Sequence, residues 1–332
     1  MVNNKFGLVY NGALTENQEG QVTIETVHYQ TANGIEVVAN LYRPANFDAK
    51  GAYPALTVAH PNGGVKEQVS GYFAQQLAQA GFVTIAADAA YQGASSGEPR
   101  NRDYPANRVE DIRAMADCLE TVPGVDTTRI GAIGICGGGG YTIEAVKTDK
   151  RFKAVATVSM FNSGRVRRNG FMDSQLDSIQ QRLEQAAAAR TKYITTGEVD
   201  YVGQYLSGRQ HLTQEQLEQI PAGLYREGVQ YYGDTHYHPN SQSWYTTESL
   251  IHLMGFDAED RAELINQPLL MIAGKDADTR YMSDAVFEKA ENAQEKELFL
   301  VEGASHIETY WKEPYVTEES AKLVEFFRKH LK

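Results

Sequence analysis

Hydrophobic residues follow two different patterns along the chain. Near the N-terminus they alternate with polar residues over 22–27 and, approximately, over 35–41, and Ala32-Asn33-Gly34 lies between the two stretches. Alternation with a period of two is typical of a half-buried strand, and Asn-Gly favours a tight turn. The sequence therefore predicts that the first part of the chain forms a β-hairpin.

After this hairpin the apolar residues form short continuous runs, most of them followed by a helical pattern. Strands without a polar face belong in a sheet that is covered on both sides, and alternation with helices indicates parallel β–α units. We therefore expect an α/β fold with a mostly parallel, doubly wound sheet of about eight strands. The runs are residues 55–59, 82–87, 130–135, 154–158, 269–273 and 298–301.

The alternation of strands and helices stops after Met160. Residues 161–261 contain no clear strand-like run, but hold helical segments rich in Gln, Glu and Ala, followed by a stretch rich in Tyr and His. The aromatic content argues against a disordered insert. We predict a core of residues 1–160 and 262–332, with 161–261 inserted as a helical cap between two strands of one sheet.

Composition and charge narrow the possible partners. Acidic residues outnumber basic residues by 43 to 31, and no Lys/Arg cluster offers a surface for nucleic acid. No apolar stretch approaches the roughly 18 residues that span a bilayer, and the N-terminus lacks the pattern of a signal peptide. Two cysteines are no disulfide framework. We expect no nucleic-acid or membrane partner and a cytoplasmic location.

The clearest chemical signal lies around Cys136. The segment Gly134-Ile135-Cys136-Gly137-Gly138 has the form G-x-C-x-G, follows an apolar run, and precedes a helical pattern. This is the context of a nucleophile elbow, in which a sharp strand-to-helix turn presents the nucleophile and the next amide, here that of Gly137, faces the oxyanion. The alternatives are a buried structural cysteine or a dinucleotide loop, whose G-x-G-x-x-G spacing is not matched. Cys118 is expected to be a core thiol.

A base and an acid are expected on later loops. His306 follows the apolar run 298–301, and Asp276 and Asp278 follow the run 269–273. The resulting chain order of nucleophile, acid and histidine is that of the α/β-hydrolase fold. We favour Asp278 as the residue that orients His306, with Asp276 as the alternative; either aspartate could instead lie in a solvated loop or cap a turn.

A second oxyanion donor is expected after the first long parallel strand, where the chain reads His60-Pro61-Asn62-Gly63-Gly64. Glycines there allow backbone N–H groups to face the site, so the amide of Asn62 or Gly63 is predicted to contribute. The alternative is an ordinary turn.

Aromatic side chains of the cap are candidates for substrate contact. Tyr232, Tyr237 and Trp244 are expected either to line an apolar pocket or to pack the cap onto the core. His236 and His238 form a His-x-His pair without an evident third ligand, so we predict neither a metal nor a cofactor. Two arginines of the core, Arg100 and Arg108, could bind a substrate carboxylate or form structural ion pairs.

Several motifs together resemble a known family. They are His60-Pro61-x-Gly63-Gly64, Tyr91-Gln92-Gly93, Ser96-Gly97-Glu98-Pro99-Arg100, the Cys136 elbow, Ala277-Asp278-Thr279 and Gly303-Ala304-x-His306. The chain resembles the dienelactone-hydrolase-like branch of the α/β-hydrolase superfamily, in particular the bacterial YcjY-type hydrolases. The resemblance implies the α/β-hydrolase fold and a triad of Cys136, Asp278 and His306. The dienelactone hydrolases proper are shorter and lack a cap of this size.

These observations predict a hydrolase that forms an acyl-enzyme on Cys136. Thiolate is a good leaving group, which favours carboxylic esters, lactones or thioesters as substrates over amides. An acyltransferase that uses the same intermediate is one alternative, and a non-catalytic ligand-binding protein on the same fold is another. The expected partner is a small acyl compound, and a homodimer is left open.

Overall fold

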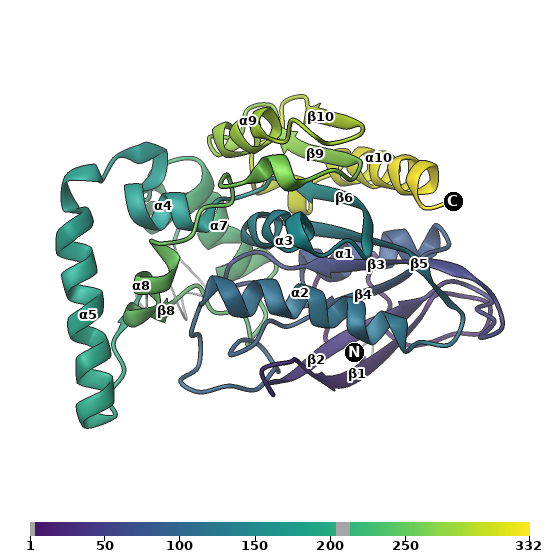
Figure 1. Ribbon diagram of the computed structural model, residues 1–332, viewed down its shortest axis with the longest axis horizontal. Helices are drawn as coiled ribbons and strands as arrows, with labels where there is room; N and C mark the ends of the chain where they lie inside the picture. Colours follow the sequence, from purple (N-terminus) through teal and green to yellow (C-terminus); the bar gives the residue numbers. More distant parts are fainter. Residues whose placement is uncertain (1–3, 204–212) are drawn as a thin grey trace.

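Eight strands form one sheet in the order β1-β2-β4-β3-β5-β6-β9-β10 in the computed structural model, which describes residues 4–203 and 213–332 (Figure 1). β1 and β2 form the predicted hairpin, β2 is also antiparallel to β4, and all other neighbours in this sheet are parallel. The strands are β1 (Thr23–Gln30), β2 (Glu36–Arg43), β3 (Tyr53–Ala59), β4 (Val83–Ala87), β5 (Val125–Ile135), β6 (Phe152–Val158), β9 (Leu269–Gly274) and β10 (Lys296–Val301).

The central strands are buried on both faces, which explains their continuous apolar runs. Every residue of β4 and β9 is buried, as are the last six residues of β5. Two pairs of helices lie against the sheet, α2 with α3 and α1 with α10, and Figure 1 shows α2 and α3 in front of the strands. The helices of this part are α1 (Val69–Gln79), α2 (Pro105–Glu120), α3 (Gly137–Thr148), α9 (Arg280–Lys289) and α10 (Tyr315–His330). The expected mostly parallel, doubly wound sheet of eight strands is therefore confirmed.

The chain between β6 and β9, here called the β6–β9 insertion (residues 159–268), is mainly helical. Figure 1 shows α4, α7 and α8 gathered at one end of the sheet, with α5 standing furthest out. The longer helices are α4 (Ser163–Asn169), α5 (Ile179–Thr196), α6 (Gln214–Glu218), α7 (Leu224–Gln230) and α8 (Leu250–Leu253). The short 3₁₀ or π-helical turns among the described residues are η1 (Phe171–Asp173), η2 (Leu176–Ser178), η4 (Tyr231–Thr235), η5 (Thr247–Ser249), η6 (Ala262–Leu264) and η7 (Glu308–Tyr310).

The insertion also contains a small sheet that the sequence pattern did not predict. β7 (Tyr201–Val202) pairs antiparallel with β8 (Tyr245–Thr246). A strand of two residues is too short to show a period of two, so its pairing depends on tertiary contacts.

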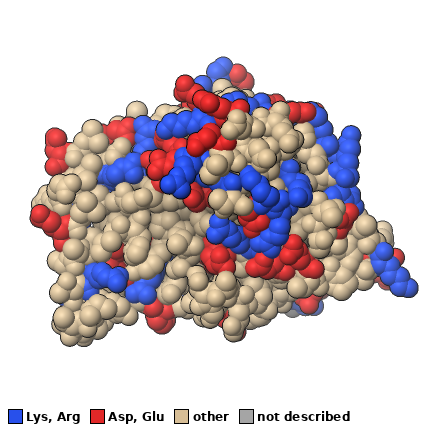
Figure 2. Space-filling view, viewed as in Figure 1, with Lys and Arg blue, Asp and Glu red and all other residues tan. Residues whose placement is uncertain are grey.

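The surface carries charges of both signs. On the face shown in Figure 2, Lys and Arg side chains are interspersed with Asp and Glu side chains. Within the described part of the chain, no helix is both long enough and apolar enough to cross a bilayer.

Candidate active site

Cys136 occupies the turn between β5 and α3, at the carboxyl end of the sheet's central strands. Its backbone angles are φ 53° and ψ −122°, a sparsely populated region for a residue with a Cβ atom. The strain is held in place by hydrogen bonds: the Cys136 amide donates to the carbonyl of Val158 at 3.0 Å, and its carbonyl accepts from the amides of Gly139 and Phe161 at 2.9 and 2.8 Å. This is the geometry of the predicted nucleophile elbow.

Glycine is required on the α3 side of this turn because the neighbouring loop approaches very closely. A Cβ atom on Gly138 would lie 2.5 Å from the carbonyl oxygens of both Ala59 and His60, and one on Gly137 would lie 2.1 Å from the side chain of Asn62. The close contact brings the loop after β3 against the start of α3. Two backbone segments that are distant in sequence therefore meet at the cysteine.

The amides of Gly137 and Asn62 both face the sulfur of Cys136, and their hydrogen bonds lower its pKa. Burial has the larger effect and raises the pKa of the thiol above its ordinary value, because the thiolate is poorly solvated there. Cys136 is therefore a neutral thiol at neutral pH, held where two N–H donors converge. Such a pair of donors is suited to an oxyanion that forms next to the sulfur.

Gly63, the third residue predicted to donate a hydrogen bond to the oxyanion, contacts the β6–β9 insertion. Its carbonyl accepts hydrogen bonds from the Ser241 hydroxyl at 2.6 Å and the Gln242 amide at 3.1 Å. Gly63 thus joins the β3–α1 loop to the β6–β9 insertion, and the amide that faces the sulfur from this loop belongs to Asn62.

His306 is fully buried and has two side-chain hydrogen bonds. Its Nδ1 lies 2.5 Å from the hydroxyl of Thr279, and its Nε2 lies 2.8 Å from the hydroxyl of Tyr310. The Tyr310 hydroxyl is in turn hydrogen-bonded to the thiol of Cys136. Burial lowers the pKa of His306 to about 3, so the imidazole is neutral. The predicted nucleophile and the predicted base are thus connected through a tyrosine.

The structure does not bring either candidate aspartate to His306. The carboxylate of Asp278 accepts a hydrogen bond from the amide of Leu224 at 3.0 Å, at the first residue of α7, and Asp276 is exposed. Burial alone accounts for the pKa shift of His306. Along the turn from β9 to α9, the side chain directed at the imidazole is that of Thr279, one residue after the expected one.

A cavity of about 850 Å³ opens at Cys136 and is enclosed largely by the β6–β9 insertion. Of the three aromatic residues proposed for substrate contact, Tyr232 and Tyr237 line this cavity. Trp244 is not among the described residues that line the cavity: its indole packs edge-on against Tyr201 and donates a hydrogen bond to Gln242.

The other candidates for ligand binding have structural contacts. The ring of His236 stacks on Tyr231 with centroids 4.4 Å apart, and no group of three possible metal ligands occurs within residues 4–203 and 213–332. Arg100 donates to the carbonyls of Ser95 and Gly93, and Arg108 donates to the carbonyl of His60. Neither of these arginines lines the cavity.

Sequence reasoning missed Thr279, Tyr310 and Arg167. Thr279 directly follows the favoured aspartate, and Tyr310 lies four residues after His306, where one helical turn brings a side chain back to the same side. Those two spacings are signals that could have identified them. Arg167, which lines the cavity from α4, has no comparable signal in the sequence.

Alkylation of Cys136 by iodoacetamide is expected to be slow at pH 7 and to accelerate as the pH rises past the ordinary thiol range. The thiolate is the reacting species, and a raised pKa moves its formation to higher pH. Peptide mass spectrometry measures the rate at each pH, with protein in denaturant as the reference. Faster labelling of Cys136 at pH 7 in the folded protein than in the denatured protein would contradict the buried, neutral thiol.

The arrangement of sheet, elbow and late histidine loop is that of an α/β hydrolase. The model of the dienelactone hydrolase family matches residues 38–219. The Escherichia coli (strain K12) protein YcjY is 39% identical over 300 residues, covering 90% of this chain and 95% of YcjY. The chain therefore belongs to the dienelactone hydrolase family.

Solved structures agree with this fold. The hypothetical protein PA2218 from Pseudomonas aeruginosa matches with a TM-score of 0.83 and 33% identity, covering 95% of this chain and 96% of that one. The α/β hydrolase GrgF from Penicillium sp. sh18 matches with a TM-score of 0.73 and 20% identity, covering 93% of this chain and 99% of that one.

Proposed function

We propose that the protein hydrolyses a carboxylic ester, lactone or thioester through an acyl-enzyme on Cys136. The observation that carries this proposal is the position of the thiol. It lies on a strained elbow, at the wall of a large cavity, with the amides of Gly137 and Asn62 directed at the sulfur. A structural cysteine would need neither the strained backbone nor the two converging donors.

The proton of the thiol is proposed to reach His306 through Tyr310. With Nδ1 protonated, the imidazole donates to the Thr279 hydroxyl and accepts at Nε2 from Tyr310. When the sulfur attacks, the thiol proton passes to the tyrosine oxygen and the tyrosine proton passes to Nε2. The result is an imidazolium and an attacking sulfur, while Tyr310 is neutral before and after the transfer.

The chemical steps then follow those of covalent acyl transfer. The sulfur forms a bond to the carbonyl carbon, and the carbonyl oxygen becomes an oxyanion held by the amides of Gly137 and Asn62. Collapse expels the alcohol or thiol, which takes the proton back from His306 along the same path. Water then attacks the thioester, loses its proton to His306, and the acid is released with a protonated Cys136.

Because Cys136 and His306 are buried and neutral, substrates with activated acyl groups are favoured. Burial raises the pKa of Cys136 and lowers that of His306, so the charged pair forms only as the reaction proceeds. A thiol ester intermediate forms readily when the leaving group departs more easily than the sulfur, as an activated alcohol or a thiol does. An amine leaves less readily, so amides are poorer substrates.

A panel of p-nitrophenyl esters and acyl thioesters tests the proposal, with the products identified by mass spectrometry. We expect release of the free acid and of nitrophenol or thiol. Transfer of the acyl group to an added alcohol or thiol, in preference to water, would instead identify an acyltransferase. The absence of turnover on every member, with no acyl group bound to Cys136, would refute the proposal.

Replacing Tyr310 with phenylalanine is expected to lower kcat about 100-fold, because the substitution removes the group that connects the thiol to the imidazole. The matched control is Tyr231→Phe. The ring of Tyr231 is equally buried and packs edge-on against Tyr310, but it does not line the cavity. Steady-state kinetics on one ester measure both variants. Equal activity of Tyr310→Phe and Tyr231→Phe would contradict the relay.

A further inference from the structure

The wall of the active-site cavity has a charge opposite to that of the whole protein. The chain carries a net charge of −12, yet the described residues that line the cavity include Arg167 and Arg182 and neither Asp nor Glu. We propose that Arg167 binds an anionic group of the substrate, so that the preferred acyl donor carries a carboxylate, as a monoester or monothioester of a dicarboxylic acid does. This inference rests on the proposed function and names its substrate class.

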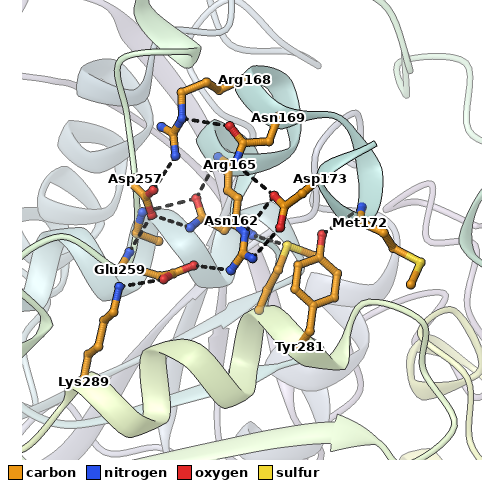
Figure 3. Close-up of polar contacts among 12 residues, drawn as sticks. Asn162, Arg165, Arg168, Asn169, Met172, Asp173, Asp257, Glu259, Tyr281 and Lys289 are labelled. Atoms are coloured by element: carbon orange, nitrogen blue, oxygen red, sulfur yellow. Dashed lines mark hydrogen bonds and ion pairs between the residues drawn. The ribbon is translucent and has the colours of Figure 1, made fainter. Parts of the chain in front are cut away.

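The arginines beside Arg167 in α4 are neutralised by carboxylates (Figure 3). Their partners, at N···O distances of 2.7 to 2.8 Å, are Asp173 and Glu259 for Arg165, and Asp257 for Arg168. These two side chains therefore serve to hold α4 against neighbouring segments. Their positions also show that carboxylates are available around this helix, although none pairs with Arg167 among the described residues.

Arg167 has no such partner among the described residues. No carboxylate oxygen of residues 4–203 or 213–332 lies within ion-pair distance of its guanidinium, and its buried Nε has no hydrogen bond to them. The guanidinium instead lies over the ring of Tyr245, 4.8 Å from the centroid. The nearby Asp103 acts on it only through longer-range attraction and faces Arg108 at 3.9 Å. A buried donor without a partner is costly unless a ligand satisfies it.

The helix that carries Arg167 is fixed before any ligand binds. The Asn162 side chain accepts from the amide of Arg165 at the start of α4 and donates to Asp257 at 2.6 Å. At the other end, the guanidinium of Arg182 donates to the carbonyls of Arg167 and Arg168. Arg182 is thus occupied by backbone oxygens, so of the two arginines among the described lining residues Arg167 is the one that can take up a ligand. A fixed guanidinium loses little entropy when it binds a carboxylate.

Arg167 lines the same cavity as the sulfur of Cys136, where the acyl group would be bound. The cavity that it lines contains Cys136, and its charge acts on the thiol of that residue. An acyl group bound at the sulfur can therefore extend along the same cavity towards the guanidinium. The described wall near Arg167 includes apolar and aromatic residues such as Val166 and Phe171, and a surrounding of low polarity strengthens an ion pair.

Two esters of equal chain length test the inference: the mono-p-nitrophenyl ester of glutaric acid and p-nitrophenyl valerate. We expect the intact protein to have a higher kcat/KM for the glutaric ester. In Arg167→Met the ratio of the two kcat/KM values should fall about tenfold or more, because a charge-assisted hydrogen bond is lost. Arg167→Lys keeps the charge without the planar fork, and should retain part of the preference.

The control is Arg168→Met, which removes an equal charge from the same helix but away from the cavity, and should leave the ratio unchanged. A proportional fall in both kcat/KM values in Arg167→Met would mean that Arg167 acts on the reactivity of Cys136, and would overturn the inference. So would a wild-type protein that prefers the valerate. Thermal unfolding shows whether each variant is folded.

A binding measurement separates this inference from the proposed reaction. Monomethyl glutarate and methyl valerate are titrated into Cys136→Ala by calorimetry, with and without Arg167→Met. Tighter binding of the glutarate that depends on Arg167 would support the anion site even if no ester were turned over. Equal binding of the two compounds would overturn it, whatever the outcome of the kinetic assays.

Discussion

Replacing Cys136 with alanine is expected to lower kcat for an activated ester by about 10⁴-fold. The substitution removes the atom that is proposed to form the acyl-enzyme, and no other nucleophilic side chain of the described elbow can take its place. The loss should appear in kcat rather than in KM, because the cavity and the two amides stay in place. Stopped-flow and steady-state measurements of nitrophenol release give both constants.

The matched control for this variant is Cys118→Ala. Cys118 lies in α2, outside the active-site cavity, and burial together with the charge of Asp117 raises its pKa to about 11. The loss of the Cys118 thiol should leave kcat within about twofold of the value for the intact protein, as expected for a substitution away from the site. If Cys136→Ala retained the activity of Cys118→Ala, another residue would have to be the nucleophile.

Replacing His306 with alanine should lower kcat by about 10³-fold, since the imidazole is the proposed acceptor for the thiol proton. The pH dependence should change as well. In the intact protein the neutral imidazole is available above pH 3, because burial lowers its pKa to about 3. The variant should gain activity only as rising pH ionises the thiol without a base. A pH series of kcat for His306→Ala and the exposed-site control His28→Ala measures this.

The same assay compares the two residues next to each other on the β9–α9 turn. Thr279→Val removes the hydroxyl that fixes Nδ1 of His306, whereas Asp278→Asn changes a carboxylate that accepts from the Leu224 amide. We therefore expect the larger fall in kcat for Thr279→Val. A larger fall for Asp278→Asn would show that the aspartate approaches His306 during the reaction, as the family resemblance implies.

The sequence was sufficient to predict the sheet and the elbow because both depend on local rules. Continuous apolar runs such as those of β4 and β9 indicate strands covered on both faces, and the glycines around Cys136 indicate a close backbone approach. The placement of His306 followed from chain order alone. The sheet, the elbow and the late histidine can therefore be recognised from the residues that form them.

The partners of His306 could not be predicted in the same way. Whether Asp278 or Thr279 faces the imidazole depends on the backbone angles of a short turn, in which neighbouring side chains point in different directions. Tyr310 enters the site only because η7 folds back towards the elbow. The residues of the β6–β9 insertion that form the cavity wall are likewise set by tertiary packing.

Burial of Cys136 and His306 is the reason for proposing a proton relay between them. A thiol and an imidazole in contact with water would share a proton readily, but here burial raises the pKa of one and lowers that of the other. The proposed proton transfer would therefore be assisted by a path of hydrogen bonds and by the donors that stabilise the oxyanion. Both requirements are met by groups that contact Cys136 directly, namely Tyr310, Gly137 and Asn62.

The most direct test of the account is to detect the acyl-enzyme itself. The protein is mixed with an activated ester, quenched in acid within the first turnover, and analysed by intact mass and peptide mapping. We predict a mass increase equal to that of the acyl group, located on Cys136 and absent in Cys136→Ala. Turnover without any adduct on Cys136, or an adduct on another residue that persists in Cys136→Ala, would contradict it.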